Sequence, residues 1–527
     1  SWPVFYGAAA STYEVASTRG ELYRRSDGLL KRYIDPVQRH FVASLSTAES
    51  VSDSREKLLK DFRAYQLDTV EVGKRDKAER FFILPNIRDR AGNHKLATLL
   101  ARNQVKVHRA TETFEACKND YKSGAYIIDT AQPRGRYAKT VLTRHVDMGE
   151  AFIQEQERLR ARKLNSEIYD VTAWSLPLMF NLDVDTCGKV FKVALQAVGG
   201  SDKLDGNVSY PEGHKTEGSD VVAYVVPWGD MAAGRFLTSA LRDGVKLKSA
   251  DEAFTLKNGT SFPAGSLIIE VADNETGIAG KIQALANASG TYVFATKSSW
   301  VIEGPNFGSG NTVRLKAPNV AMAWDSPANY LSAGNTRFVI EQQIGYPVTA
   351  IRSQQLKSAD LSNYDVLILP SGNYASTLGK SGAENLERWV EQGGVLITLG
   401  GATRYAANAG LLKTRVEDAV MDLNTPPQNQ KEDGETGRAT GSLIDSDQSL
   451  LSAIKSETSP PDYVSGVLAN IEVDQEHWLT AGVHRSVVSL VAGRDIFAPI
   501  KLDAGKNVAW FKGADELLAS GYLYDEN

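Results

Sequence analysis

Two stretches of this 527-residue chain repeat one pattern, and this repetition is the feature that most constrains its fold. Each stretch opens with an apolar run that ends in proline, at residues 81–85 and 223–227. Helical spacing of apolar residues follows, and a second apolar run begins at Gly124 and at Gly265. The offset is 142 residues at the prolines and 141 at the glycines. The pattern predicts a duplicated strand–helix–strand–strand unit. Two copies are too few for a solenoid, so we expect a pair of similar small α/β lobes.

The last third of the chain alternates apolar strands with amphipathic helices. We predict strands at 320–324, 347–351, 364–370 and 395–399, with a helix at 330–343 and another carrying Leu386, Trp389 and Val390. Strands that are apolar along their whole length indicate a parallel sheet covered on both faces. The predicted fold class is therefore α/β with several domains. Residues 304–311 are predicted to be a hinge, and the polar segment 425–461 a long surface excursion.

The N-terminal region predicts a strand followed by two helices. Residues 11–16 are expected to form a short buried strand, and residues 27–72 two amphipathic helices with a break at 46–54. Glu14 lies in that apolar strand, where an unpaired carboxylate is costly to bury. A structural ion pair with Arg19 is one explanation of this carboxylate.

Composition excludes several classes of protein. With 59 Lys and Arg against 64 Asp and Glu, the net charge is −5, so no basic excess is available for nucleic acid. No apolar run reaches the ~18 residues that cross a bilayer. The two cysteines, Cys117 and Cys187, are too few for a disulfide scaffold or a cysteine zinc cluster, and they do not indicate a redox compartment.

Three segments carry a resemblance to a known family. Residues 7–20, 23–28 and 168–178 resemble bacterial zinc carboxypeptidases of the carboxypeptidase A-like family. The resemblance implies that residues 1–75 are the C-terminal end of a catalytic domain and that residues 76–310 form the duplicated middle region. It also implies a secreted or periplasmic protein that hydrolyses peptide bonds at the C-termini of peptides or proteins.

The same resemblance gives Glu14 a role. In this family the strand glutamate is the general base, which takes a proton from a zinc-bound water. The family's zinc ligands precede that glutamate, whereas only thirteen residues precede Glu14 here. We therefore expect the zinc ligands and the substrate-binding residues upstream of Ser1, so that this chain alone is inactive and binds no stoichiometric zinc.

Two further motifs have structural explanations that require no metal or phosphate site. One His-x-x-Glu occurs, His214 to Glu217, but it follows Glu14 and the next histidine is His477, so a solvated loop is favoured over a metal site. Residues 374–381 end like a phosphate-binding loop, but tyrosine stands where that motif requires glycine. We expect a turn and a helix start there.

Residues 365–372 and 393–402 resemble the class I glutamine amidotransferase-like fold, which assigns residues 317–527 to such a domain, truncated at its end. Family members carry a nucleophilic cysteine at the sharp turn after the second of these strands. Here the turn 400–403 reads Gly-Gly-Ala-Thr, which excludes thiol catalysis. We expect this turn at the carboxyl end of a central parallel strand, with no side-chain nucleophile near it.

Two functions from different classes follow. The first is a fragment of a zinc metallocarboxypeptidase with Glu14 as general base. The alternative is a non-catalytic binding or scaffolding protein, in which Glu14 is structural and the amidotransferase-like domain holds a ligand. The sequence immediately upstream would discriminate them, since a His-x-x-Glu and a spaced histidine there would support the peptidase.

Overall fold

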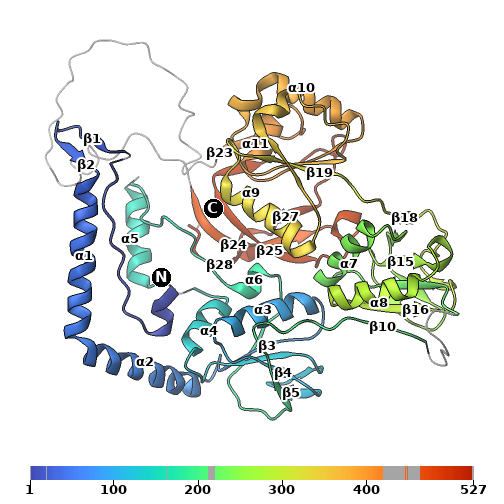
Figure 1. The fold of residues 1–527 in the computed structure, drawn as a ribbon, viewed down its shortest axis with the longest axis horizontal. Coiled ribbons are helices and arrows are strands. Elements are labelled where there is room, and N and C mark those ends of the chain that lie inside the picture. Colours follow the sequence, from blue (N-terminus) through green and yellow to red (C-terminus); the bar gives the residue numbers. More distant parts are fainter. Residues whose placement is uncertain are drawn as a thin grey trace. The chain divides into compact units, whose positions relative to one another are not determined.

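The computed structural model describes residues 2–18, 20–146, 148–162, 164–211, 220–418, 446, 448 and 463–524. It is a mixed α/β protein with several sheets, one of them parallel throughout (Figure 1). Contacts divide the chain into two units. The first comprises residues 1–87, 95–143 and 183–202, and the second residues 88–94, 144–182 and 203–527. Each unit is described by itself.

The first unit contains one copy of the repeat, here called the first lobe. Its five-stranded antiparallel sheet has the order β8-β3-β7-β4-β9. The elements are β3 (Phe81–Leu84), α3 (Arg90–Arg102), β4 (His108–Ala110), β5 (Phe114–Ala116), β6 (Asn119–Tyr121), β7 (Tyr126–Asp129), α4 (Gly135–Leu142), β8 (Asp185–Cys187) and β9 (Leu195–Ala197). All four residues of β3 are buried, which explains its unbroken apolar sequence.

The second lobe, in the second unit, has the sheet order β10-β16-β11-β15-β12-β18. Its elements are β10 (Asn207–Ser209), β11 (Ala223–Val226), α7 (Met231–Arg242), β12 (Lys248–Ala250), β13 (Phe254–Leu256), β14 (Ser261–Phe262), β15 (Leu267–Glu270), η2 (Val271–Asp273), α8 (Ile278–Ser289), β16 (Tyr292–Thr296), β17 (Val301–Glu303) and β18 (Thr312–Arg314). Apart from the added β10, the strand order and the antiparallel pairing repeat those of the first lobe, as the sequence repeat predicts.

Two details of the lobes correct the sequence-based prediction. The strand predicted directly after the helix of each copy, at 105–107 and 245–247, begins three residues later, at His108 and at Lys248. The apolar residues before each strand are buried in the approach to it, so burial without pairing produced the apolar signal. The predicted hinge 304–311 is also part of the second lobe, because Phe307 is buried against Phe254.

The N-terminal helices are confirmed, with a shorter break. α1 (Ile34–Asp53) and α2 (Arg55–Arg75) are separated at Ser54 alone, and not over 46–54 (Figure 1). The predicted buried strand at 11–16 is wrong: these residues are irregular, and only Val15 among them is partly buried. A short hairpin of β1 (Leu22–Arg24) and β2 (Leu30–Arg32) follows, after the 3-10 helix η1 (Trp2–Tyr6).

The segment 168–178 anchors to the C-terminal sheet through Thr172, whereas its aromatic residues Tyr169 and Trp174 are exposed. The backbone N–H and the hydroxyl of Thr172 both donate to the carbonyl of Gly466, at 2.8 and 2.9 Å. The preceding helix, α5 (Glu150–Ala161), places Arg160 over the ring of Tyr524, 4.1 Å from its centroid. The short helix α6 (Leu176–Met179) then contacts β25.

The parallel sheet has the order β20-β19-β21-β22, and its last strand lies at the edge instead of the centre. Its elements are β19 (Val320–Trp324), α9 (Tyr330–Arg337), the π-helix η3 (Phe338–Ile344), β20 (Thr349–Arg352), η4 (Ser353–Lys357), β21 (Val366–Leu369), α10 (Ala375–Glu391), β22 (Val395–Thr398) and α11 (Gly401–Asn408). The predicted strands and helices are thus confirmed, with boundaries shifted by at most a few residues.

Antiparallel strands complete the second unit. They are β23 (Val416–Asp418), β24 (Val464–Val473), β25 (Ser486–Gly493), β26 (Asp495–Phe497), β27 (Ala509–Phe511) and β28 (Leu518–Ser520), with η5 (Trp478–Thr480) and α13 (Ala514–Leu517). β24 pairs with β25 on one side and with β27 and β28 on the other, and β23 pairs with β26. Across the described ranges, no helix combines the length and the apolar character that a bilayer span needs.

Candidate functional site

A crevice lies at the carboxyl ends of β19 and β21, where the strand order of the parallel sheet reverses. In open α/β sheets this switch point is where ligands usually bind. The crevice has a volume of about 490 Å³ and is lined mainly by polar side chains and glycines, among them Asn329, Ser371, Asn373 and Arg404. Its walls come from the loops that follow these two strands, from α11 and from Asp495.

The turn after β22 begins with Gly400 in a backbone conformation that glycine adopts most readily, and Gly400 carries no nucleophile. Gly400 has φ 50° and ψ −124°, a conformation that residues with a side chain rarely adopt. A Cβ on Gly400 would lie 2.8 Å from the hydroxyl oxygen of Ser371, and that hydroxyl accepts a hydrogen bond from the N–H of Gly401 (3.1 Å). The turn therefore brings a serine close, which the sequence did not predict, but no histidine lines the described crevice to activate it.

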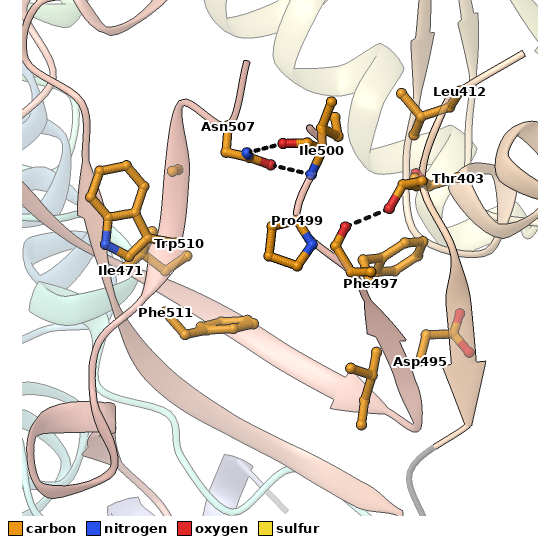
Figure 2. Close-up of a pocket in the computed structure, with 14 residues that line it drawn as sticks. Thr403, Leu412, Ile471, Asp495, Phe497, Pro499, Ile500, Asn507, Trp510 and Phe511 are labelled. Carbon is orange, nitrogen blue, oxygen red and sulfur yellow. Dashed lines mark hydrogen bonds between the residues drawn. The ribbon is translucent and has the colours of Figure 1, made fainter. Parts of the chain in front are cut away.

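A larger cavity of about 790 Å³ adjoins the crevice, and Figure 2 shows its walls. Trp510 and Phe511 of β27 lie on one side, and Phe497 and Pro499 face them across the cavity. Asp495 lines both the cavity and the crevice. Size and lining fit a ligand site, since such sites are 300–1,000 Å³ and mostly apolar with a few polar groups.

The polar side chains of this cavity are engaged with the protein itself. Asn507 accepts a hydrogen bond from the N–H of Ile500 and donates to its carbonyl, at 2.9 and 2.8 Å, which closes the loop between them. Arg404 donates to Asp495 from two nitrogens, at 3.0 and 2.6 Å. Aromatic and aliphatic surface is thus the main side-chain chemistry that the cavity offers to a ligand.

Two carboxylates, Asp89 and Asp230, each cap two helices. Asp89 Oδ1 accepts hydrogen bonds from the N–H groups of Gly92 (2.8 Å) and of Met231 in α7 (3.1 Å). Asp230 Oδ1 accepts reciprocally from Ala232 (2.9 Å) and from the first turn of α3 (3.2 Å). These bonds join residues 88–94 to the start of α7 within the second unit. The arrangement satisfies N–H groups that a helix start leaves without partners.

The surroundings of Asp230, Asp89 among them, also shift its ionisation. Burial raises the pKa of Asp230 to about 6, and the charge of Asp89 acts in the same direction, against the N–H of Ala232 and the guanidinium of Arg90. Arg90 Nε lies 3.9 Å from Asp230 Oδ2. Asp230 is therefore a carboxyl group that binds a proton near pH 6. No sequence motif identified this arrangement, because Asp89 and Asp230 are 141 residues apart.

The structure does not assemble the residues that the carboxypeptidase resemblance selects. Glu14 is exposed on an irregular segment, and the alternative partner Arg19 lies outside the described residues. The motif from His214 to Glu217 and nearly all of the predicted excursion 425–461 also lie outside them. Within the described ranges, no three His, Cys, Asp or Glu side chains are grouped as metal ligands, so these residues do not fit a zinc ion.

The segment that resembled a phosphate-binding loop is the start of α10. Tyr374 is fully buried, and its hydroxyl donates to the carbonyl of Pro370 (3.0 Å). Lys380, the residue that would contact a phosphate, is 91% exposed and pairs with Glu384. Tyr374 therefore anchors the start of α10 in the core. The helix start agrees with the prediction for this segment.

Cys117 and Cys187 form a disulfide within the first lobe, which the sequence did not predict. It links the turn between β5 and β6 to the end of β8, across 70 residues. Disulfides persist mainly in oxidising compartments. The cysteine pair is therefore informative about compartment, although either cysteine alone carried no such information.

Comparisons with protein-family models, with curated proteins and with solved structures find no match to this chain. The resemblances to carboxypeptidases and to amidotransferases therefore rest on the sequence segments that carry them.

Proposed function

We propose that residues 317–527 are a binding domain with an amidotransferase-like architecture and no glutaminase chemistry. The turn at Gly400 carries this proposal: amidotransferase-like domains place their nucleophile at the sharp turn after this strand, whereas Gly400 has a positive φ and no side chain. A domain that keeps the crevice and lacks the nucleophile is suited to bind a ligand without transforming it.

The ligand occupies the apolar cavity beside the crevice. Removing apolar surface from water is favourable by about 25 cal/mol per Å², before the costs of association are subtracted. Trp510 and Phe511 are both about half exposed on the cavity wall, at 47% and 54%, so a ligand can cover them. The ligand is therefore apolar or aromatic in the part that enters the cavity.

Binding of an apolar fluorescent probe tests this function. We expect 1-anilinonaphthalene-8-sulfonate to bind the full chain saturably, and Phe511→Ala to weaken binding at least tenfold. Phe338→Ala is the matched control, because Phe338 is similarly exposed (52%) but does not line the cavity. Equal binding by both variants would contradict the proposal, as would ammonia release from glutamine.

For the N-terminal part, we propose a role in a zinc metallocarboxypeptidase acting on peptide or protein C-termini, in which Glu14 accepts a proton. The sequence resemblance supports this role. The disulfide supports a secreted or periplasmic location, because such bonds are rare in reducing compartments. Substitution of Glu14 in the complete protein tests the role.

A further inference from the structure

One edge of β27 has backbone groups without a partner strand. Lys512 donates its N–H to Asn470, and Asp474 donates to Val508, so every second residue of β27 bonds to β24. In an antiparallel ladder the residues between them, Ala509 and Phe511, point their N–H and C=O groups the other way. These groups have no backbone partner among the described residues, and both residues line the cavity.

A second open edge borders the same cavity. Ala498 donates its N–H to the carbonyl of Arg415, which extends the ladder of β23 and β26. By the same alternation, Asp495 and Phe497 point their backbone groups away from β23. Both residues line the cavity, and neither is paired with another strand on that side in the described part of the chain. The cavity is thus bordered by two strand edges that have backbone hydrogen-bonding capacity to spare.

Lysines flank the residues that line the cavity. Lys413 lies between the lining residues Leu412 and Thr414, Lys501 follows Ile500, and Lys506 precedes Asn507. All three lysines are exposed, and none forms an ion pair with a described residue. Asp503 is the one acidic residue between the last two. The surroundings of the cavity therefore favour an anionic partner.

From these observations we propose that the cavity binds an extended peptide segment that carries acidic residues around an aromatic one. The peptide backbone pairs with the open edge of β27, its aromatic side chain enters the cavity, and its carboxylates face the lysines. This mode is β-strand addition, in which backbone bonds give affinity and side-chain pockets give specificity. The proposal rests on the binding function proposed above and names the ligand's chemical class.

The unengaged polar groups distinguish a peptide from a small apolar molecule. Asn507, Arg404 and Asp495 already bond within the protein, whereas the free donors and acceptors belong to the backbone at every second residue. A strand offers complementary groups at the same spacing, ~6.6–6.8 Å for two residues. An apolar molecule would cover these groups without bonding to them, which is unfavourable.

A labelled peptide tests the proposal directly. The probe is an amide-capped, fluorescein-labelled peptide of sequence EVFVE, titrated with the full chain and followed by fluorescence anisotropy. We expect saturable binding, at least tenfold weaker binding of KVFVK, and a dependence on backbone methylation. N-methylation at every second residue blocks the peptide N–H groups on one side of the strand. Methylation of the set that faces β27 should weaken binding at least tenfold, and methylation of the alternate set should change it little. Equal affinity of both methylated peptides and the parent would overturn the proposal.

Protein variants give an independent arm. Ala509→Pro removes an N–H that β24 does not use, and proline is tolerated at strand edges. It should weaken EVFVE binding at least tenfold while leaving the unfolding temperature unchanged. Lys501→Glu with Lys506→Glu should also weaken peptide binding, whereas Lys203→Glu, an exposed lysine of the second unit away from the lining, should not.

The outcomes separate the two proposals. If the dye binds the cavity and the peptide does not, the peptide inference fails and the binding function stands. If neither binds, both fail. A dimer in light scattering that the peptide does not dissociate, and that Ala509→Pro abolishes, would assign the edge to a second copy of the chain and would also overturn the inference. Should Ala509→Pro fail to fold, the methylated peptides still decide.

Discussion

Loss of the disulfide should destabilise the first lobe substantially. Cys187 is 2% exposed at the end of β8, while Cys117 lies in the exposed turn between β5 and β6. Without the bond, the hairpin is still attached to the first lobe by other contacts. Phe114 stacks on Tyr121 and on Phe191, and the Tyr121 hydroxyl donates to Asp185 of β8 (2.9 Å). The perturbation is either reduction or the double substitution Cys117→Ser with Cys187→Ser.

The magnitude follows from the closed loop. The two cysteines are 70 residues apart, and a cross-link of that span lowers the entropy of the unfolded chain by an amount worth about 4 kcal/mol at 25 °C. For a domain of roughly 150–250 residues, each kcal/mol shifts the unfolding temperature by about 2–4 °C. We therefore expect the transition of the first unit to fall by roughly 8–16 °C.

Differential scanning calorimetry with and without reductant is the assay. The second lobe has no cysteine, so transitions of the second unit serve as an internal control and should not move. The Ser/Ser variant should melt at the temperature of the reduced wild type and should not respond to reductant. A shift below about 2 °C on reduction, with the bond shown to be broken, would refute the reasoning.

Three other substitutions test separate parts of the structure. Because the folded-state pKa of Asp230, about 6, lies above its unfolded value of 3.8, its contribution to stability is present below about pH 4 and is lost as the pH rises to about 6. Asp230→Asn keeps an accepting oxygen without the charge. In urea unfolding, the variant and the wild type should be equally stable at pH 4, and at pH 7.5 the variant should be more stable by up to about 3 kcal/mol. A difference in stability that does not depend on pH would contradict this. Gly400→Ala should lower the free energy of unfolding by roughly 1–3 kcal/mol in the same assay, because φ at this position is positive and the added Cβ meets Ser371. Gly401→Ala is the control and should cost less, since the nearest atom to its added Cβ lies at 3.3 Å. Equal losses of stability would refute the strain argument. If the N-terminal part acts in a zinc metallocarboxypeptidase, as proposed, Glu14→Gln should lower turnover by roughly 10²-fold or more at unchanged zinc content, and turnover within a few-fold of wild type would favour a structural carboxylate.

Much of the fold was predictable because its signals are local. The strand Phe81–Leu84 is buried along its length and Val366–Leu369 at its last three residues, so their apolar runs identified them. The repeat with its offset of 141–142 residues predicted two lobes with one strand order. The strand predicted at 11–16 failed because an apolar run indicates burial only where a neighbour is available, and no described strand pairs with it.

The candidate sites were less predictable because their members are distant in sequence. The cavity is lined by residues between 403 and 511. Its open edges depend on which residues of each strand point their backbone groups toward the neighbouring strand, and composition does not encode this. Asp89 and Asp230 meet through reciprocal capping, although the repeat placed both after equivalent strands and so held a usable signal. The missing nucleophile at Gly400 was readable directly, since it depends on one residue type.

The central claim is that the domain spanning 317–527 binds a ligand in the cavity beside its parallel sheet. Amide hydrogen exchange of the full chain, with and without saturating anilinonaphthalene sulfonate, tests it most directly. The account predicts slower exchange at residues 495–500 and 507–511, which line the cavity, and unchanged exchange in the strands of both lobes. Protection confined to the lobes or to α1 and α2, with none at the cavity, would contradict it.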